Sequence, residues 1–295
     1  MRLGVRKRME FIEARLYWEG RISRKDLVDF FEISIPQATK DIKEYSEKAP
    51  DNIRYDQSVK HYIATENFTP TVSTPSSEDY LTRLRLLPGK KDATKFFNSG
   101  SIPPFSEIPK FQRSVDKNVL KPLLRSIHDK QAVEVNYQSM SCPEPELRWI
   151  TPHSLGCDGF RWHVRALCHR SSMYKDFNLG RILSITRTKN DKFDHSIDYE
   201  WNNEITIKIA PNKGLSPGQR ACIERDYGMK DGEISLEIKA AFFYYFKKRF
   251  GFGVDHDKSP GNEQQIILLN HDEVSAKIDL LQSMSKKKIW QLRTA

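Results

Sequence analysis

The spacing of apolar residues changes once along the chain, and this change constrains the fold more than any other feature. Near the N-terminus apolar residues recur every three or four positions, the period of an amphipathic helix, at Val5, Met9, Ile12 and Leu16. From Ala132 onward apolar and polar residues alternate, which is the period of a strand. A chain of 295 residues with both periods is expected to hold more than one domain and an α+β fold.

The N-terminal segment predicts three helices in succession. Gly20 is suited to end the first helix. Ser23, followed by Asp26, is a good cap for a short second helix. The stretch Ser34-Ile35-Pro36-Gln37 resembles a capping box with proline in the first turn of a third helix. The predicted buried stripe of that helix is Ile35, Ala38, Ile42 and Tyr45.

A β-hairpin is expected after these helices, because Ile53-Arg54-Tyr55 and Lys60-His61-Tyr62-Ile63 flank a polar turn. Three helices with a short turn between the last two, followed by a hairpin, are typical of a winged helix-turn-helix. We therefore predict a DNA-binding domain at residues 1–68. The alternative is a packing module that docks another protein, which would make the chain an interaction scaffold.

The residues expected to contact DNA are the polar and basic ones at helix starts, on the open face of the third helix and on the wing. They are Ser23, Arg24, Ser34, Gln37, Thr39, Lys40, Lys43, Arg54, Lys60 and His61.

Charge supports an anionic partner only modestly. The chain carries 48 basic and 39 acidic residues, a net charge of +9. Residues 1–65 hold 13 basic and 11 acidic side chains, a net +2. DNA binding by this domain is therefore expected to depend on a few well-placed contacts.

The middle of the chain predicts a connector and then a small β domain. Residues 69–77 are rich in Ser, Thr and Pro, and helices are expected at Glu78–Leu87 and Asp116–Asp129, so residues 69–130 are assigned to a linker with helices. Further strands are expected at Leu147–Pro152, Phe160–Cys168 and Lys175–Ile185, and Cys157-Asp158-Gly159 is a hairpin turn signal. Several short strands with close turns favour a small barrel or sandwich.

Three stretches of this β segment resemble the WYL domain. They are Ile150-Thr151-Pro152-His153-Ser154-Leu155, Gly159-Phe160-Arg161-Trp162-His163-Val164-Arg165-Ala166 and Asp176-Phe177-Asn178-Leu179-Gly180-Arg181-Ile182. The name-giving Trp-Tyr-Leu is altered here to Trp162-His163-Val164. With Tyr137-Gln138-Ser139-Met140-Ser141 upstream, the chain is similar to the WYL repressors found beside BREX and CBASS phage-defence systems.

This resemblance implies a domain order and a function. It implies a winged helix-turn-helix, an Sm-like β-barrel WYL domain that senses a ligand at residues 131–197, and a C-terminal dimerisation extension at residues 198–295. The implied protein is a repressor that binds an inverted-repeat operator in double-stranded DNA as a homodimer. Its ligand would carry phosphate, as a nucleotide or short nucleic acid does.

Matching the motifs residue by residue places the ligand-binding residues at Tyr137, Ser139, His153, Ser154, Arg165 and Arg181. The planar guanidinium groups of Arg165 and Arg181 are suited to phosphate. The alternative is that Arg181 pairs with Asp176 or Asp158 and that His153 is a half-buried structural histidine. Trp162 and His163 are adjacent on one strand, so only one of them can face the pocket.

The C-terminal segment predicts a small α/β unit. A strand is expected at Trp201–Ile209, a helix capped by Ser216 that runs to about Tyr227, a strand around Ile234–Ile238, and an aromatic-rich helix at Ala240–Phe250. That aromatic helix could belong to a dimer interface or to ordinary core.

Several other classes of protein find little support. No phosphate-binding, dinucleotide-binding or nucleophile-elbow motif is present, and the eight His and four Cys show no metal-site spacing. We expect no enzyme activity, no cofactor and no metal; a metal-dependent nuclease built on Asp226, Glu237 and Lys239 is a remote alternative. The longest apolar run, Ala240–Phe246, is far too short for a membrane span, and the basic N-terminus lacks a signal sequence, so a cytoplasmic protein is expected.

Overall fold

A computed structural model describes residues 3–86, 103–108, 113–191, 193–253 and 258–294. The chain divides into two compact units, residues 1–110 and 111–295. The first unit contains α1 (Leu3–Glu19), β1 (Arg21–Ile22), α2 (Arg24–Phe31), α3 (Ile35–Lys48), a 3₁₀ turn (Pro50–Asn52), β2 (Ile53–Asp56), β3 (His61–Ala64) and α4 (Ser77–Arg85).

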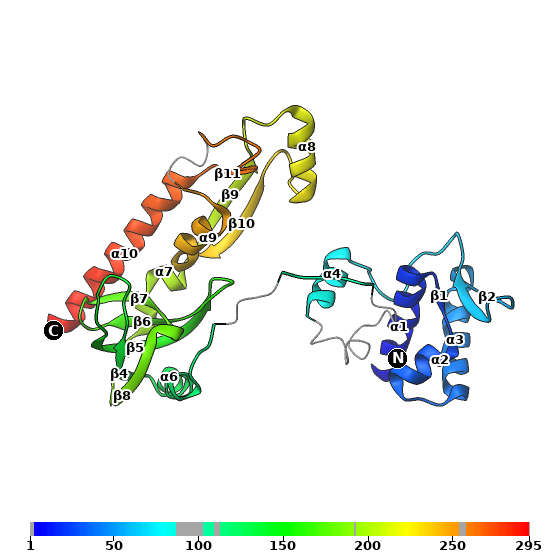
Figure 1. Ribbon diagram of the computed structural model, residues 1–295, viewed down its shortest axis with the longest axis horizontal. Helices are drawn as coiled ribbons and strands as arrows, with labels where there is room; N and C mark the ends of the chain where they lie inside the picture. The colour runs from blue at the N-terminus through cyan, green and yellow to red at the C-terminus, as the bar shows by residue number, and fades with distance from the viewer. Residues whose placement is uncertain (1–2, 87–102, 109–112, 192, 254–257, 295) are drawn as a thin grey trace. The chain divides into compact units, whose positions relative to one another are not determined.

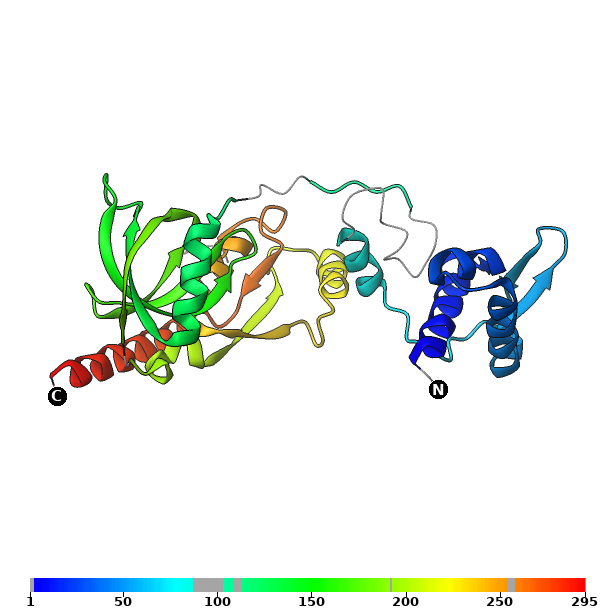
Figure 2. The same ribbon diagram turned by 90° about the horizontal axis from the view of Figure 1, so that it is seen from below.

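The first unit is a three-helix bundle with a three-stranded sheet, as the sequence predicts. The strand order is β1-β3-β2, and the β2–β3 hairpin extends beyond the helices (Figure 2). The bundle core includes Met9, Ile12 and Leu16 from α1, with Ile42 and Tyr45 from α3. The capping box of α2 is present, since the side chains of Ser23 and Asp26 each bond the other residue's backbone. The helix-turn-helix with a wing is therefore confirmed in this unit.

The second unit contains two sheets and their helices (Figure 1). Its first part consists of α6 (Lys117–Asp129), β4 (Gln131–Tyr137), β5 (Glu146–Cys157), β6 (Trp162–Cys168), β7 (Met173–Asn178), a 3₁₀ turn (Leu179–Arg181) and β8 (Ile182–Asn190). Its second part consists of a 3₁₀ turn (His195–Ile197), α7 (Tyr199–Asn202), β9 (Glu204–Pro211), α8 (Pro217–Asp226), β10 (Ile234–Lys239), a 3₁₀ turn (Ala240–Phe242), α9 (Phe243–Phe250), β11 (Ile266–Leu268) and α10 (His271–Thr294).

The larger sheet has five antiparallel strands in the order β7-β6-β5-β4-β8. Within the described residues no pairing joins β7 to β8, so the sheet is open at that point and the expected closed Sm-like barrel is not confirmed. Helix α6 packs on this sheet through Val119 and Leu123, which share a core with Val133, Ile150 and Val164 (Figure 2). The segment expected as one strand at Lys175–Ile185 is two strands, β7 and β8, separated by a 3₁₀ turn.

The smaller sheet has the order β10-β9-β11 and is covered by α8, α9 and part of α10. The strand expected from Trp201 begins at Glu204 instead, because Trp201 lies in the short helix α7, which Asp198 caps. Helix α10 reaches two cores. Val274 and Leu281 pack with the smaller sheet, whereas Ile289 packs with Leu167 and Tyr174 of the larger one. In the described part of the chain no helix is long and apolar enough to cross a bilayer.

Candidate nucleic-acid interface and ligand cavity

Helix α3 presents a buried face to the bundle and an open face to solvent. Ser34 caps it, and the Ser34 hydroxyl accepts a hydrogen bond from the Gln37 N–H at 3.4 Å. Ala38, Ile42 and Tyr45 are buried as predicted. Ile35 is not: it is the first residue of the helix, 63% of its surface is exposed, and it does not belong to the core of the bundle. The predicted buried stripe is therefore wrong at that position.

The three acidic residues of α3 are neutralised within the first unit. Asp41 is 1% exposed and accepts hydrogen bonds from Arg8 Nε at 2.6 Å and from Gln37 Nε2 at 2.9 Å. Glu44 pairs with Lys48 at 2.7 Å and Glu47 with Lys43 at 3.8 Å. These pairings reduce the repulsion that the acids would exert on a phosphate backbone.

The predicted DNA contacts fall into two groups. Some are already engaged: the Ser23 hydroxyl bonds Asp26, the Gln37 amide bonds Asp41, the Thr39 hydroxyl donates to Ile35 O at 3.0 Å, and His61 Nδ1 lies 2.6 Å from Val59 O. The exposed basic side chains are Arg24, Lys40, Lys43, Arg54 and Lys60. They lie on α2, α3 and the wing of the first unit. Their contact with DNA stays a prediction.

The tip of the wing is shaped by Asp56. Its carboxylate accepts from the Ser58 N–H at 2.8 Å and from the Ser58 hydroxyl at 2.5 Å, which holds the turn between β2 and β3. Lys60 follows in the left-handed region with φ of 53°, so the hairpin turns sharply before β3. This geometry leaves the Lys60 side chain exposed at the tip.

A buried carboxylate fixes the segment that follows the wing. Glu13 on α1 is 0% exposed and accepts from the backbone N–H groups of Thr71 at 2.7 Å, Val72 at 2.9 Å and Ser73 at 2.7 Å. Burial alone would raise the pKa of Glu13, but these donors hold it below its usual value. The Ser/Thr-rich stretch expected as a linker is thus attached to the bundle here.

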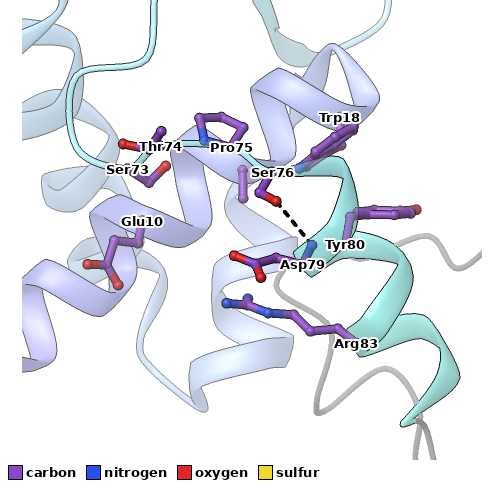
Figure 3. A pocket seen from close by; sticks show the side chains of 10 residues that line it. Glu10, Trp18, Ser73, Thr74, Pro75, Ser76, Asp79, Tyr80 and Arg83 are labelled. Atoms are coloured by element: carbon purple, nitrogen blue, oxygen red, sulfur yellow. Dashed lines mark hydrogen bonds between the residues drawn. The ribbon is translucent and has the colours of Figure 1, made fainter. Parts of the chain in front are cut away.

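A cavity of about 280 Å³ lies between α1, this segment and α4 (Figure 3). Trp18 and Tyr80 form one wall with ring centroids 4.7 Å apart. The carboxylates of Glu10 and Asp79 line it together with Arg83. With two carboxylates and one cation, this cavity is poorly suited to a phosphate.

A larger cavity, of about 620 Å³, lies in the second unit. On one side it is lined by side chains from β4, β6, β7, the loops that flank β5 and the 3₁₀ turn after β7, and on the other side by side chains from α9. Its lining is rich in cations and aromatic rings: Tyr137, Met140, Asp158, Phe160, Arg161, His163, Asp176, Asn178, Arg181, Tyr244, Tyr245, Lys248 and Arg249.

The charges of this larger cavity favour an anion. Asp158 is held by the ring of His163 at 3.1 Å and by Arg161 at 3.4 Å. Burial alone would raise the pKa of Asp158, but hydrogen bonds from the Phe160 N–H and the His163 ring keep it below its usual value. Among the described residues no carboxylate lies within ion-pair distance of Arg181, Lys248 or Arg249. Within that part of the chain these three cations therefore have no acidic partner.

Two of the six predicted ligand residues, Tyr137 and Arg181, line the larger cavity. The alternative pairing of Arg181 with Asp176 or Asp158 is not observed in the described residues. His163 faces the cavity and is 6% exposed, whereas Trp162 on the other face of β6 is 53% exposed. His163 is therefore the inward member of that pair.

Arg165, His153 and Ser154 belong instead to a buried network beside the cavity. Arg165 is 4% exposed; its Nε and Nη2 atoms bond Asp198 at 2.7 and 2.9 Å, and Nη2 also bonds Glu200 at 2.9 Å. His153 Nε2 lies 2.9 Å from Asp198, and His153 Nδ1 lies 2.9 Å from the Ser154 hydroxyl. Burial alone would lower the pKa of Arg165, but these carboxylates raise it above its ordinary value.

The network touches the cavity at Asp176. Its carboxylate lies 3.4 Å from Arg165 Nη1 and accepts from the Tyr245 hydroxyl at 3.2 Å. Burial and the facing Asp176 raise the pKa of Tyr245, so the phenol stays protonated and donates. Ser139, the remaining predicted residue, bonds Ser141 at 2.7 Å and does not line the cavity. The ligand role of all six residues stays a prediction.

Sequence reasoning missed the α9 side of the cavity. Tyr244, Tyr245, Lys248 and Arg249 come from the aromatic helix that the sequence assigned to core or dimer contacts. One signal was available: the run Lys247-Lys248-Arg249 follows the aromatic residues directly and cannot be core.

The remote nuclease alternative gains no geometric support. Lys239 Nζ donates to Trp201 O at 2.9 Å, and Glu237 accepts from the Thr206 hydroxyl at 2.6 Å. Within the described residues no group of three metal-ligating side chains is found.

Comparison with known families agrees with this architecture. Three family models match the chain: the BrxR transcriptional regulator winged helix-turn-helix domain at residues 4–86, the WYL domain at residues 118–187, and the BrxR transcriptional regulator C-terminal dimerization domain at residues 204–274. The chain is thus a WYL-domain transcriptional regulator with a winged helix-turn-helix.

Full-length relatives narrow this class. A DNA-binding transcriptional repressor CapW from Escherichia coli (strain KTE188) is 40% identical over 93% of this chain and 92% of its own length. CapW proteins from Stenotrophomonas maltophilia and Pseudomonas aeruginosa are 37% and 36% identical, over 93% and 95% of this chain and 92% and 93% of their own lengths. The chain belongs to the CapW family of DNA-binding transcriptional repressors.

Proposed function

We propose that this chain represses transcription by binding an inverted-repeat operator as a homodimer. Each protomer would place the N-terminal end of α3 in a major groove and its wing on the adjacent backbone. Two such helices related by a two-fold axis reach half-sites separated by a multiple of about 34 Å along the duplex. The match of residues 204–274 to a dimerization domain supports the two-fold arrangement.

The observation that carries this proposal is the distribution of charge on α3. Its acids are paired within the unit, whereas Lys40 and the wing residues Arg54 and Lys60 are exposed. A helix of zero net charge can therefore still present cations to phosphate. We expect DNA binding to depend on a small number of well-placed side-chain contacts, together with the favourable interaction between phosphate and the N-terminus of α3.

Gel-shift titration of the full chain with DNA from upstream of its own operon tests the proposal. Lys40→Ala should weaken binding and reduce the slope of log affinity against log salt concentration by about 1 per lost phosphate contact. Lys121→Ala, an exposed lysine on α6 of the second unit, is the matched control and should leave both unchanged. Equal effects of the two substitutions, or no sequence-specific shift, would refute the operator proposal.

We further propose that the larger cavity of the second unit takes a phosphate-bearing ligand that carries an aromatic base. Arg181, Lys248 and Arg249 supply three cations without carboxylate partners among the described residues, and the exposed rings of Phe160 and Tyr244 supply surfaces on which a base can stack. The volume of about 620 Å³ suits a nucleotide or a short single strand.

Calorimetric titration with adenosine diphosphate and with a four-nucleotide single-stranded DNA tests this assignment. Arg181→Ala and Lys248→Ala should each weaken binding of the better probe by about tenfold, since each removes a charge-assisted contact. Lys175→Ala is the control, because Lys175 is exposed on β7 and does not line the cavity. Unaltered binding by both cavity variants, or no binding of either probe, would rule the assignment out.

A further inference from the structure

Ile35 is an apolar side chain in the place where a recognition helix approaches bases. It is the first residue of α3, directly after the Ser34 cap, and 63% of its surface is exposed. The helical period would assign Ile35 to the core, yet the core of the bundle does not reach it. An exposed β-branched side chain at this position is available to contact an apolar group of a bound partner.

The polar side chains of the first turns are already engaged. Gln37 Nε2 donates to Asp41 Oδ1 at 2.9 Å, and Asp41 is itself held by Arg8 through two hydrogen bonds of 2.6 and 3.2 Å. A glutamine reads adenine by using its N–H₂ and its oxygen together. The bond to Asp41 occupies one of the two amide N–H groups of Gln37 and sets the orientation of the amide, so Gln37 is not free to turn toward a base while that bond holds.

Thr39 is engaged in the same way. Its hydroxyl donates to Ile35 O at 3.0 Å, so Thr39 can still offer a partner its methyl and an acceptor oxygen but no donor. Residues 35, 39 and 43 are four apart and lie along one side of the helix. That side therefore runs from Ile35 through the Thr39 methyl to Lys43, whose side chain is 77% exposed.

The major groove presents one apolar group, the C5-methyl of thymine. We infer that this helix reads thymine methyl groups through Ile35, with Thr39 beside it, and that Lys43 lies toward the phosphate backbone. Ile35 is then a residue that determines specificity for DNA. This inference rests on the operator proposal above and is independent of the cavity.

The test replaces thymine by deoxyuridine, which pairs in the same way but lacks the methyl. The duplex is the upstream fragment that the full chain protects in a footprint. Each thymine in both half-sites is replaced in turn. At one thymine of each half-site, the unaltered chain should lose about fourfold in affinity per methyl, the factor that corresponds to one buried methylene-sized group at about 0.8 kcal/mol.

The second part of the test repeats these measurements with the variant Ile35→Ala. This variant should bind the thymine duplex less tightly and should show no further loss when that thymine becomes deoxyuridine. Because Ile35 is exposed and alanine favours helix, the substitution is compatible with folding. Leu81→Ala is the matched control, since Leu81 is 57% exposed on α4 of the same unit and should retain the full sensitivity to deoxyuridine.

The outcomes separate the inference from the proposal on which it rests. Specific binding with no sensitive thymine, or the same fourfold loss in Ile35→Ala as in the unaltered chain, overturns the assignment of Ile35 and leaves the operator proposal standing. Absence of specific binding to every upstream fragment overturns both.

Discussion

Replacing Arg165 by alanine should destabilise the second unit severely, although the residue lies next to a proposed ligand cavity. Its guanidinium contacts Asp198, Glu200 and Asp176, and Asp198 is 0% exposed. In Arg165→Ala the Asp198 carboxylate stays buried, with His153 and the Trp201 N–H as its remaining partners. Removing one partner of a buried ion pair typically costs about 3–5 kcal/mol, because an uncompensated charge is left inside.

Urea denaturation followed by tryptophan fluorescence measures this effect. Four of the five tryptophans, Trp149, Trp162, Trp201 and Trp290, lie in the second unit, so its unfolding dominates the signal. Arg170→Ala is the control, because this exposed arginine just after β6 pairs with a partly exposed Glu146 that keeps Arg148 as a second partner, and its midpoint should barely move.

The loss of stability in Arg165→Ala should depend on pH, because it arises from the charge on Asp198. Burial alone would raise its pKa, but Arg165 and His153 hold it below its ordinary value in the folded chain. A lowered carboxylate pKa contributes stability above the unfolded value of about 4, and this is lost as pH falls through the folded pKa. The cost of Arg165→Ala should therefore shrink below about pH 4. A midpoint for Arg165→Ala no lower than that of Arg170→Ala at pH 7 would refute the reasoning.

Three further predictions concern Glu13 and Gly159. Glu13→Gln should speed amide hydrogen exchange at residues 71–73 by about 30-fold, because hydrogen bonds to a charged acceptor contribute about 2 kcal/mol. Glu66→Gln, on the exposed surface, is the control and should leave these rates unchanged. Equal exchange rates in the two variants would contradict the anchoring role of Glu13. Since the pKa of Glu13 is lowered, its contribution should be present above about pH 4.5 and be lost on acidification, which exchange at several pH values would show after correction for intrinsic rates. Gly159→Ala should weaken ligand binding in calorimetry, because the added Cβ would lie 2.4 Å from Arg249 Nη1 and the backbone has a φ of +89°. Gly218→Ala, whose Cβ would meet nothing within 4 Å, is the control. Equal affinities of the two variants would show that Arg249 is not part of the ligand site.

Local signals were predictable from sequence. The caps at Ser23, Ser34 and Ser216 depend on residues within one helical turn, and all three are present. Periodicity failed where the end of an element decides exposure, as at Ile35, and where a short turn interrupts an alternating run, as between β7 and β8. There Asn178 accepts from the Gly180 N–H and closes a 3₁₀ turn that a period of two cannot show.

The candidate site was less predictable because its pairings are long-range. Arg165 has the residue type and position expected of a phosphate ligand, yet its partners Asp198 and Glu200 lie 33 and 35 residues further along the chain. Spacing cannot show that those carboxylates fold back onto the strand. Tyr137 and Arg181 meet in the cavity, but α9, which forms its other wall, follows them by more than 60 residues.

Helix α10 connects the two sheets of the second unit, because each end of it packs in a different core. Val274 is fixed in the core of the smaller sheet and Ile289 in the cluster with Leu167 and Tyr174, about 22 Å apart along the helix axis. Between these two residues Gln282 donates to Glu200, and Ser285 accepts from the Tyr199 N–H. The middle of the helix therefore contacts the segment that carries the carboxylate partners of Arg165. A rotation of one sheet against the other would therefore have to tilt α10 or break the packing of Val274 or of Ile289.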